Sequence, residues 1–364
     1  MRNHFDLIVA GAGIAGITSA AAAASRGLKV ALVSSGPGSF VLGAGCVELQ
    51  DTERGLHSLD EAVNFFRNLT ELAGCSFRGN IGEVRHLPTI LGSFQTVSLA
   101  PFSMWNGAPE AAAQVAVVGI KGLSSFDSNF VAERLAYHAA KLGRGSTYIA
   151  REIELSIEKD TIPGTLQFGN RFDRDPHFRE ELLAALKPIA AKVSLIIVPG
   201  IFGLKSGQDE IEKLEKELGC LLCELPTLPP SIPGMRLFNR LEMQLRRTGV
   251  EFFTGFPIQK LQIENTRCTG VLLDTPARPL QLSSETLILA TGPFSGKLLD
   301  TTSFGVNSDL HPVDSSGALI ADNLYAAGAI LRSSSARGGN AMAILTGYAV
   351  GMLAAGAGVQ YAQG

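Results

Sequence analysis

Several features that would assign a protein to a class at once are missing from this sequence. It has few cysteines, an odd number of them, without regular spacing: Cys46, Cys75, Cys220, Cys223 and Cys268. That pattern does not match the paired framework of a secreted, disulfide-rich domain, and it favours a reducing compartment. We also expect no signal peptide, because the apolar residues 7–10 lead directly into a glycine turn.

Charge of one sign and long apolar runs are missing as well. The 31 basic residues nearly balance the 34 acidic ones, and no Lys/Arg run is present, which excludes an extended basic surface for nucleic acid. Residues 20–24 are too few to span a bilayer, and glycines interrupt the apolar residues 341–359, so we expect a buried helix there. A hydrophobic fraction of 46% over 364 residues excludes disorder and allows two modest domains, or one large domain with an insertion.

What the sequence does contain is a complete β-α-β unit at its start. Residues 5–10 (FDLIVA) predict a buried strand, residues 14–25 an alanine-rich helix, and residues 28–33 (LKVALV) a second strand. Glycines with the G-x-G-x-x-G spacing stand between the first strand and the helix. This order of elements indicates a dinucleotide-binding fold rather than an isolated glycine turn.

Each glycine of that turn has a physical role. Gly11 allows a tight turn, Gly13 lets the backbone approach a pyrophosphate, and Gly16 lets helix and strand pack closely. The first helical residues, Ile14 and Ala15, then present free N–H groups and the positive end of the helix dipole to an anion.

The end of the second strand departs from the usual pattern. A dinucleotide-binding strand normally ends in Asp or Glu, which holds the adenosine ribose, but here Ser34 and Ser35 follow Val33. A serine hydroxyl can bind a ribose only without charge assistance. This weakens the case for NAD and leaves room for a weakly held or smaller flavin.

Later segments favour a flavin. Residues 286–292 (TLILATG) predict a buried strand that returns to the nucleotide and ends in Thr291 and Gly292. Residues 323–328 (NLYAAG) predict another, which ends at Gly328 and is followed by Ala329 where flavoproteins usually carry Asp. The loop 36–45, which contains Gly43 and Gly45, either passes close to the flavin ring or is a plain surface loop.

A second glycine turn precedes the last predicted helix. Arg337, Gly338, Gly339 and Asn340 open a helix at residues 341–355, whose N-terminus would stabilise the negative charge of a reduced flavin. A purely structural turn is the alternative.

His311, just before the last strand, is either a catalytic base or a structural loop histidine.

The middle of the chain predicts an inserted α/β domain at about residues 111–235. Strands are expected at 114–120, 194–199 and 221–225, with helices at 130–142 and 209–218. The overall prediction is a Rossmann-type two-dinucleotide-binding flavoprotein fold with an inserted α/β cap domain. Its flavin-binding domain would comprise residues 1–110 and, after the insertion, residues 236–364, where a helix with Leu237, Leu241 and Leu245 on one face leads into a strand and a hairpin.

Residues 225–236 (LPTLPPSIPGMR) carry four prolines, so we expect no regular helix or strand through them. The segment is either a rigid strap with Thr227, Ser231 and Arg236 facing the site, or a domain connector.

No metal site is predicted. Cys220 and Cys223 lie in an apolar strand, on opposite faces by alternation, and no second pair or histidine cluster accompanies them.

Taken together, these segments resemble the B subunit of the anaerobic glycerol-3-phosphate dehydrogenase over nearly the whole chain. The most telling stretches are VVGIKGL (117–123), PGIFGL (199–204), LPTLPPSIPGMRL (225–237), and the NLYAAG strand with the later Arg-Gly-Gly. The proline-rich stretch is the most specific of these. Members of that family are similar in having a weak ribose position, so Ser34 fits the resemblance.

The resemblance implies a cytoplasmic protein that associates with the inner membrane through its partners. Those partners are a catalytic flavin- and iron–sulfur-containing subunit and a membrane-anchoring iron–sulfur subunit. The complex would oxidise sn-glycerol 3-phosphate to dihydroxyacetone phosphate and pass electrons to quinone. The cofactor implied by the family is FMN, whereas the glycine motif itself favours FAD.

No catalytic residue is fixed by this pattern. Lys121, Arg236, Arg332 and Arg337 are candidate phosphate contacts, although each is as readily explained as a solvated surface residue. Two other functions stay open: a non-catalytic subunit that relays electrons or supports its partner, and a stand-alone FAD-dependent oxidoreductase acting on another small hydroxy or amino compound.

Overall fold

The computed structural model of the chain describes residues 3–49, 58–108, 113–157, 162–276, 278–292, 298–299, 305–331 and 339–357. The chain divides into two compact units. Unit one comprises Met1–Ser39, Val47–Leu69 and Leu241–Gly364, and unit two comprises Phe40–Cys46 and Thr70–Arg240. The inserted domain expected at 111–235 lies inside unit two, which begins earlier than expected because it also contains residues 70–110.

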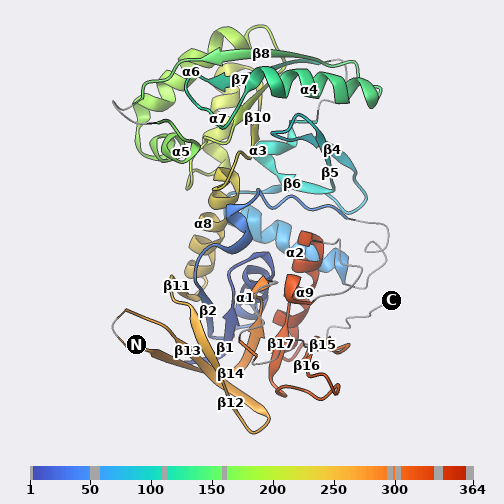
Figure 1. The fold of residues 1–364 in the computed structure, drawn as a ribbon, viewed down its shortest axis with the longest axis vertical. Coiled ribbons are helices and arrows are strands. Elements are labelled where there is room, and N and C mark those ends of the chain that lie inside the picture. Colours follow the sequence, from blue (N-terminus) through green and yellow to red (C-terminus); the bar gives the residue numbers. More distant parts are fainter. Residues whose placement is uncertain are drawn as a thin grey trace. The chain divides into compact units, whose positions relative to one another are not determined.

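Unit one is built on a seven-stranded sheet with the order β11-β2-β1-β14-β13-β12, in which β17 also pairs with β14 (Figure 1). Its strands are β1 (His4–Ala10), β2 (Val30–Ser34), β11 (Glu251–Thr254), β12 (Ile258–Glu264), β13 (Arg267–Leu273), β14 (Leu280–Leu289) and β17 (Leu324–Ala326), with a small separate pair β15 (Gly305–Val306) and β16 (Pro312–Val313). The apolar residues of β1 and β2, and Leu282 and Leu287–Leu289 of β14, are buried, as a parallel sheet requires.

Five of these strands run parallel, so their carboxyl ends lie along the same edge of the sheet. β2, β1 and β14 pair in parallel, β11 joins on the far side of β2, and β17 joins on the far side of β14. The antiparallel hairpin β12–β13 pairs with the first half of β14, whereas β17 pairs with its second half. This is the order of a Rossmann-type nucleotide-binding sheet, as expected from the sequence.

Two helices of unit one, α1 (Ile14–Ser25) and α9 (Gly339–Ala354), pack directly against each other. A Cβ at Gly347 would lie 2.5 Å from the Ala15 oxygen, and one at Gly351 would lie 2.6 Å from the Ser19 oxygen. Only glycine permits so close an approach of two backbones. The two glycines of α9 therefore hold it against the first turns of α1.

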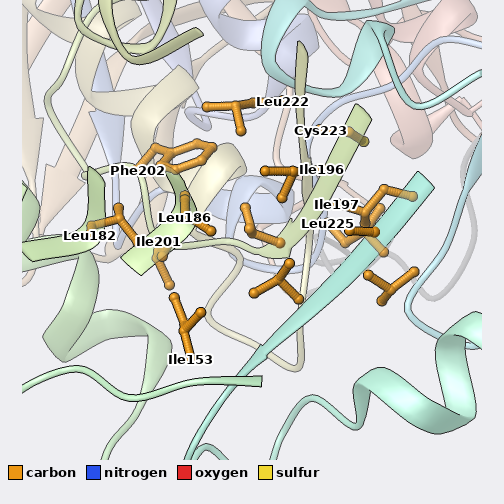
Figure 2. Close-up of a cluster of buried hydrophobic side chains, with 14 of the residues drawn as sticks. Ile153, Leu182, Leu186, Ile196, Ile197, Ile201, Phe202, Leu222, Cys223 and Leu225 are labelled. Carbon is orange, nitrogen blue, oxygen red and sulfur yellow. The ribbon is translucent and has the colours of Figure 1, made fainter. Parts of the chain in front are cut away.

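Unit two contains a four-stranded parallel sheet with the order β10-β9-β7-β8. Its elements are β3 (Phe77–Gly79), β4 (Arg85–Pro88), β5 (Phe94–Val97), β6 (Leu99–Pro101), α3 (Phe102–Trp105), β7 (Gln114–Ile120), α4 (Ser128–Lys141), β8 (Thr147–Ile153), α5 (Thr165–Arg174), α6 (Pro176–Ala190), β9 (Leu195–Pro199), α7 (Gln208–Leu218) and β10 (Leu221–Leu225). Figure 2 shows part of its core, in which Ile196 of β9 and Leu222 of β10 belong to the same buried cluster as Leu182 and Leu186 of α6. Unit two is thus an α/β domain with its own core.

The proline-rich segment differs from its prediction. We expected no regular element within residues 225–236, but helix α8 (Ile232–Arg247) begins there, so that prediction is wrong. Ser231 starts the helix: its Oγ accepts a hydrogen bond from Gly234 N at 3.2 Å. Pro233 fits in the first turn because the N–H that proline lacks has no intrahelical partner there. Further along α8, Leu237, Leu241 and Leu245 are buried, as predicted.

Two helices contribute residues to both units, namely α8 and α2 (Leu59–Leu72). Within the ranges that the structure describes, no helix has both the length and the apolar character needed to cross a bilayer. Helix α9 is largely buried, and this burial accounts for its apolar composition.

Candidate functional site

The turn between β1 and α1 is shaped by two glycines at which a Cβ would clash with backbone atoms. Gly11 has φ +114°, and a Cβ on it would lie 2.2 Å from the Ala290 oxygen, just after β14. A Cβ on Gly16 would lie 1.9 Å from the Gly11 oxygen. The close contacts predicted for Gly11 and Gly16 are therefore present, and they join the turn to β14 and α1.

Gly13 differs from the other two glycines because no described residue occupies the place of its side chain. It is the N-cap of α1 in extended conformation, and the nearest described atom to a Cβ there would be Ser39 Oγ at 3.9 Å. No side chain of the described residues caps this helix end. The first turn of α1, which begins with Ile14 and Ala15, is therefore without a side-chain cap among the described residues, and such a helix end suits an anion.

The carboxyl ends of the parallel strands bring small residues from distant parts of the sequence into one row. In sheet order this row, called here the carboxyl edge, consists of Thr254, Ser34, Gly11, Thr291 and Gly328. Ligands of open α/β sheets bind outside such an edge. The arrangement brings together four of the residues predicted from sequence and adds Thr254.

Two hydroxyl groups on the carboxyl edge are buried without a hydrogen-bond partner among the described residues. They are Thr254 Oγ1 and Thr291 Oγ1. Thr291 lies beside the glycine turn, since a Cβ on Gly11 would approach its backbone nitrogen to 3.0 Å. A buried hydroxyl without a partner is costly unless a ligand supplies one. These hydroxyls, the open space at Gly13 and the uncapped helix together fit a bound dinucleotide.

The last strand and helix also approach this site. Gly328 has φ +75°, and a Cβ on it would lie 2.7 Å from that of Ala15. Its N–H donates to Thr346 Oγ1 of α9 at 2.9 Å. The predicted residues Gly339 and Asn340 form the start of α9. Arg332, Arg337 and Gly338 lie outside the described residues.

Only the first part of the loop after β2 lies near the glycine turn. Ser34 Oγ donates to the Gly36 oxygen and accepts from Gly36 N at 3.1 Å, so it stabilises a local turn. This turn leads to Gly38, where a Cβ would lie 3.4 Å from the Gly13 Cα. Gly43 and Gly45 belong to unit two, where Gly43 contacts the first turn of α8 at Gly234.

Among the cationic candidates, the structure describes two, and both are in ion pairs. Arg236 is 3% exposed and binds Glu224, which is 0% exposed, through two bonds of 2.8 and 2.9 Å, while its Nε donates to the Gly203 oxygen. Its guanidinium is thus engaged within unit two rather than directed to a phosphate. Lys121 is exposed and lies 3.4 Å from Glu154.

His311 and the cysteines show structural contacts. His311 Nδ1 lies 2.8 Å from the Leu324 oxygen, so this nitrogen carries the proton; Leu324 is the first residue of β17, at the opposite end from Gly328. Burial raises the pKa of Cys220 to about 11 and that of Cys223 above its usual range, so both are thiols at neutral pH. Within the described ranges, no cluster of three or more His, Cys, Asp or Glu side chains is placed to hold a metal ion.

The match to a family model agrees with this geometry. The model is described as FAD binding domain, and it matches residues 6–53, 41–249 and 233–305, which overlap to cover 6–305 continuously. The chain belongs to the FAD-binding domain family. The flavin predicted from the glycine motifs is therefore supported as FAD, and the α/β flavoprotein fold predicted from the sequence is confirmed.

Curated relatives of this FAD-binding chain share one name, the B subunit of anaerobic glycerol-3-phosphate dehydrogenase. The Actinobacillus pleuropneumoniae protein is 23% identical over 328 residues, covering 80% of this chain and 75% of that protein. The Yersinia pestis protein of that name is 25% identical over 399 residues (90% and 92%), and the probable one of Halobacterium salinarum is 24% identical over 431 residues (98% and 99%). The resemblance noted in the sequence is confirmed.

Among solved structures, glycine oxidase from Bacillus cereus matches with 16% identity and a TM-score of 0.34, covering 81% of this chain and 59% of that one. A score this low adds nothing to the description of the site.

Sequence reasoning missed two polar residues, Thr254 and Glu224. Thr254 was not singled out, although it is the polar last residue of a short strand before a glycine, as Ser34 and Thr291 are near the ends of theirs. Glu224 was also missed as the partner of Arg236. A single acidic residue inside the apolar strand LLCEL was the available signal, because a buried charge requires a partner.

Proposed function

We propose that this chain binds FAD at the carboxyl edge and acts as the flavin-containing subunit of a glycerol-3-phosphate dehydrogenase complex. The observation that carries the proposal is the N-terminus of α1, where no described side chain caps the helix and the nearest described atom to a Cβ on Gly13 is Ser39 Oγ at 3.9 Å. The N–H groups of the first turn, from Ile14 to Gly16, would bind the pyrophosphate. Thr291 Oγ1 would donate to or accept from the bound cofactor, which would satisfy a hydroxyl that has no partner among the described residues.

The names of the relatives support sn-glycerol 3-phosphate as the substrate. Oxidation of sn-glycerol 3-phosphate to dihydroxyacetone phosphate removes a hydride from C2 and a proton from its hydroxyl. FAD, when bound, supplies the acceptor for the hydride. The two electrons would then pass to a catalytic flavin- and iron–sulfur-containing partner and, through a membrane-anchoring iron–sulfur subunit, to quinone.

Lys121 stays a candidate contact to the phosphate of the substrate, since its ion pair with Glu154 is exposed and weak. Arg332 and Arg337 stay candidates from the sequence. His311 stays a candidate base, with its Nε2 as the only ring nitrogen able to accept a proton while Nδ1 donates to Leu324.

A second function is favoured by one observation. Ser34 uses its hydroxyl in a local turn, and Ala329 replaces the usual acidic residue, so the cofactor would have no charge-assisted contact at either position. A loosely held flavin suits a subunit that relays electrons or supports its partner without oxidising the substrate itself.

Cofactor binding is tested with a matched pair of glycine variants. Gly13→Ala should fold normally but weaken FAD binding about tenfold or more, because its methyl group would occupy the place of the pyrophosphate. Gly164→Ala is the control, since Gly164 is also an uncapped helix N-cap with no described atom within 4 Å of a Cβ. Binding is measured by titrating the apoprotein and by chromatography of the cofactor released on denaturation. A wild-type protein that takes up no flavin, even with its partner subunits, would refute the proposal.

The substrate is tested separately. Anaerobic addition of glycerol 3-phosphate should bleach the flavin absorbance of the purified chain if it oxidises the substrate itself. Bleaching only in the presence of the partner subunits would identify a relay subunit. No bleaching in either case, with the flavin still reducible by dithionite, would indicate another substrate.

A further inference from the structure

The adenosine end of the carboxyl edge holds a side chain that the proposed function has not used. Thr254 is the last residue of β11, and it pairs in parallel register with Ser34, the last residue of β2. Paired residues of neighbouring parallel strands face the same side of a sheet. The two hydroxyl-bearing residues therefore lie next to each other at the place where a dinucleotide fold binds the ribose of adenosine.

Only one of these two hydroxyls lacks a partner among the described residues. Ser34 Oγ has both a donor and an acceptor in Gly36, whereas Thr254 Oγ1 is buried and makes no hydrogen bond. The chain that follows leaves room nearby. Gly255 has φ +89°, no described atom lies within 4 Å of a Cβ on it, and its N–H donates to the Ser34 oxygen at 2.8 Å.

We infer that Thr254, rather than Ser34, binds the adenosine half of the cofactor, and that this contact makes the chain prefer the dinucleotide FAD to the mononucleotide FMN. The inference rests on the proposed function, because it assumes a flavin at the carboxyl edge. A neutral hydroxyl suits this role, since it can both donate to and accept from a ribose hydroxyl or an adenine nitrogen. FMN has no adenosine and would leave Thr254 without a partner.

The test compares FAD and FMN on the same variants. Thr254→Val keeps the shape of the side chain and removes its hydroxyl. In apoprotein titrations followed by flavin fluorescence, it should weaken FAD binding about three- to tenfold, the effect of one lost hydrogen bond, and leave FMN binding unchanged. The melting temperature of the apoprotein should stay equal or rise, because the removed hydroxyl has no partner before FAD binds.

Three controls make the result specific. Thr254→Ser should restore FAD binding. Ser34→Ala should have less effect on it than Thr254→Val. Ser284→Ala removes another buried hydroxyl without a partner, located on β14 opposite Phe5 and so away from the carboxyl ends, and should leave both flavins unaffected.

The outcomes separate this inference from the proposed function. A wild-type protein that binds neither flavin would overturn both. A wild-type protein that binds FAD, together with a Thr254→Val variant that binds it equally well, would overturn only the role of Thr254. Equal weakening of FAD and FMN, or tighter binding of FMN than of FAD by the wild type, would also reject it, because a contact to adenosine cannot act on FMN.

Discussion

The sheets of unit one and unit two differ in whether the polar groups at the carboxyl ends of their strands have hydrogen-bond partners among the described residues. In unit two, the loops after β9 and β10 are closed by the protein itself: buried Glu224 accepts from Arg236 and from Phe202 N, and Asp173 accepts from Leu204 N and Ser206 N. In unit one, the carboxyl edge retains two hydroxyls without described partners and an uncapped helix.

This contrast indicates which sheet is suited to receive a ligand. Both sheets are parallel, and both could use the same edge. In unit two the polar groups described above already form hydrogen bonds with one another. These bonds stabilise the loops, but they leave few of these groups free to bind a ligand. In unit one the missing partners are a cost in the free protein that a cofactor would remove. Single substitutions in each unit can test whether the contrast holds.

The largest effect is expected from Arg236→Leu. Removing the guanidinium leaves the Glu224 carboxylate buried without its partner, which should lower the free energy of unfolding by about 3–5 kcal/mol. Denaturation followed by fluorescence of Trp105, the sole tryptophan, reports on unit two. The double variant Glu224→Met/Arg236→Leu should recover most of the loss. A single variant as stable as the wild type would show that the pair does not hold these loops.

A smaller loss is expected in unit one from Gly16→Ala. Its methyl group would overlap the Gly11 oxygen and force the turn apart, at a cost of about 1–3 kcal/mol in the free energy of unfolding. Circular dichroism of the apoprotein during chemical denaturation measures it. Gly13→Ala, whose methyl group enters open space, should leave the apoprotein nearly unchanged. Equal stability of the two variants would contradict the proposal that Gly16 is needed for packing and Gly13 for binding the cofactor.

The buried thiols predict a dependence on pH. Burial raises the pKa of Cys75 from 9.0 to about 12, opposed by the nearby Arg240 and Arg236. Because the unfolded thiol ionises first, the stabilisation is complete below pH 9 and is lost as the pH rises toward 12. Between pH 8 and pH 10 the loss due to Cys75 should be about 1 kcal/mol.

Cys75→Ala provides the measurement, because the other thiols are the same in both proteins. The free energy of unfolding should fall less steeply with pH in the variant than in the wild type. Identical slopes would mean that the Cys75 thiol ionises as easily in the folded protein as in the unfolded chain.

The smallest effect is expected from Lys121→Ala, the exposed counterpart of Arg236→Leu. Its pair with Glu154 is exposed on both sides, so the free energy of unfolding should change by less than about 1 kcal/mol, and FAD binding should not change. The same Trp105 denaturation checks stability. A loss as large as that of Arg236→Leu would contradict the contrast between exposed and buried pairs, whereas a raised KM for glycerol 3-phosphate alone would assign Lys121 to the substrate.

Local elements with continuous apolar runs could be predicted closely from the sequence. Helix α1 (Ile14–Ser25) and strands β7 (Gln114–Ile120) and β10 (Leu221–Leu225) have the bounds that their patterns indicated. A strand buried in a parallel sheet is rich in apolar residues, so its limits can be read from the sequence, and this holds for β10 although it contains Glu224. Strand β8 (Thr147–Ile153) was missed because, at the edge of its sheet, it is half exposed and carries polar residues.

The glycine turn between a buried strand and a helix could be found from the residues alone, since spacing and chain order suffice for that motif. The folded arrangement was needed to show that Arg236 is bound to Glu224 and that Thr254 lies beside Ser34. The reason is physical: a sheet places side by side residues that are more than two hundred positions apart. Whether a polar group has a partner depends on those neighbours in space.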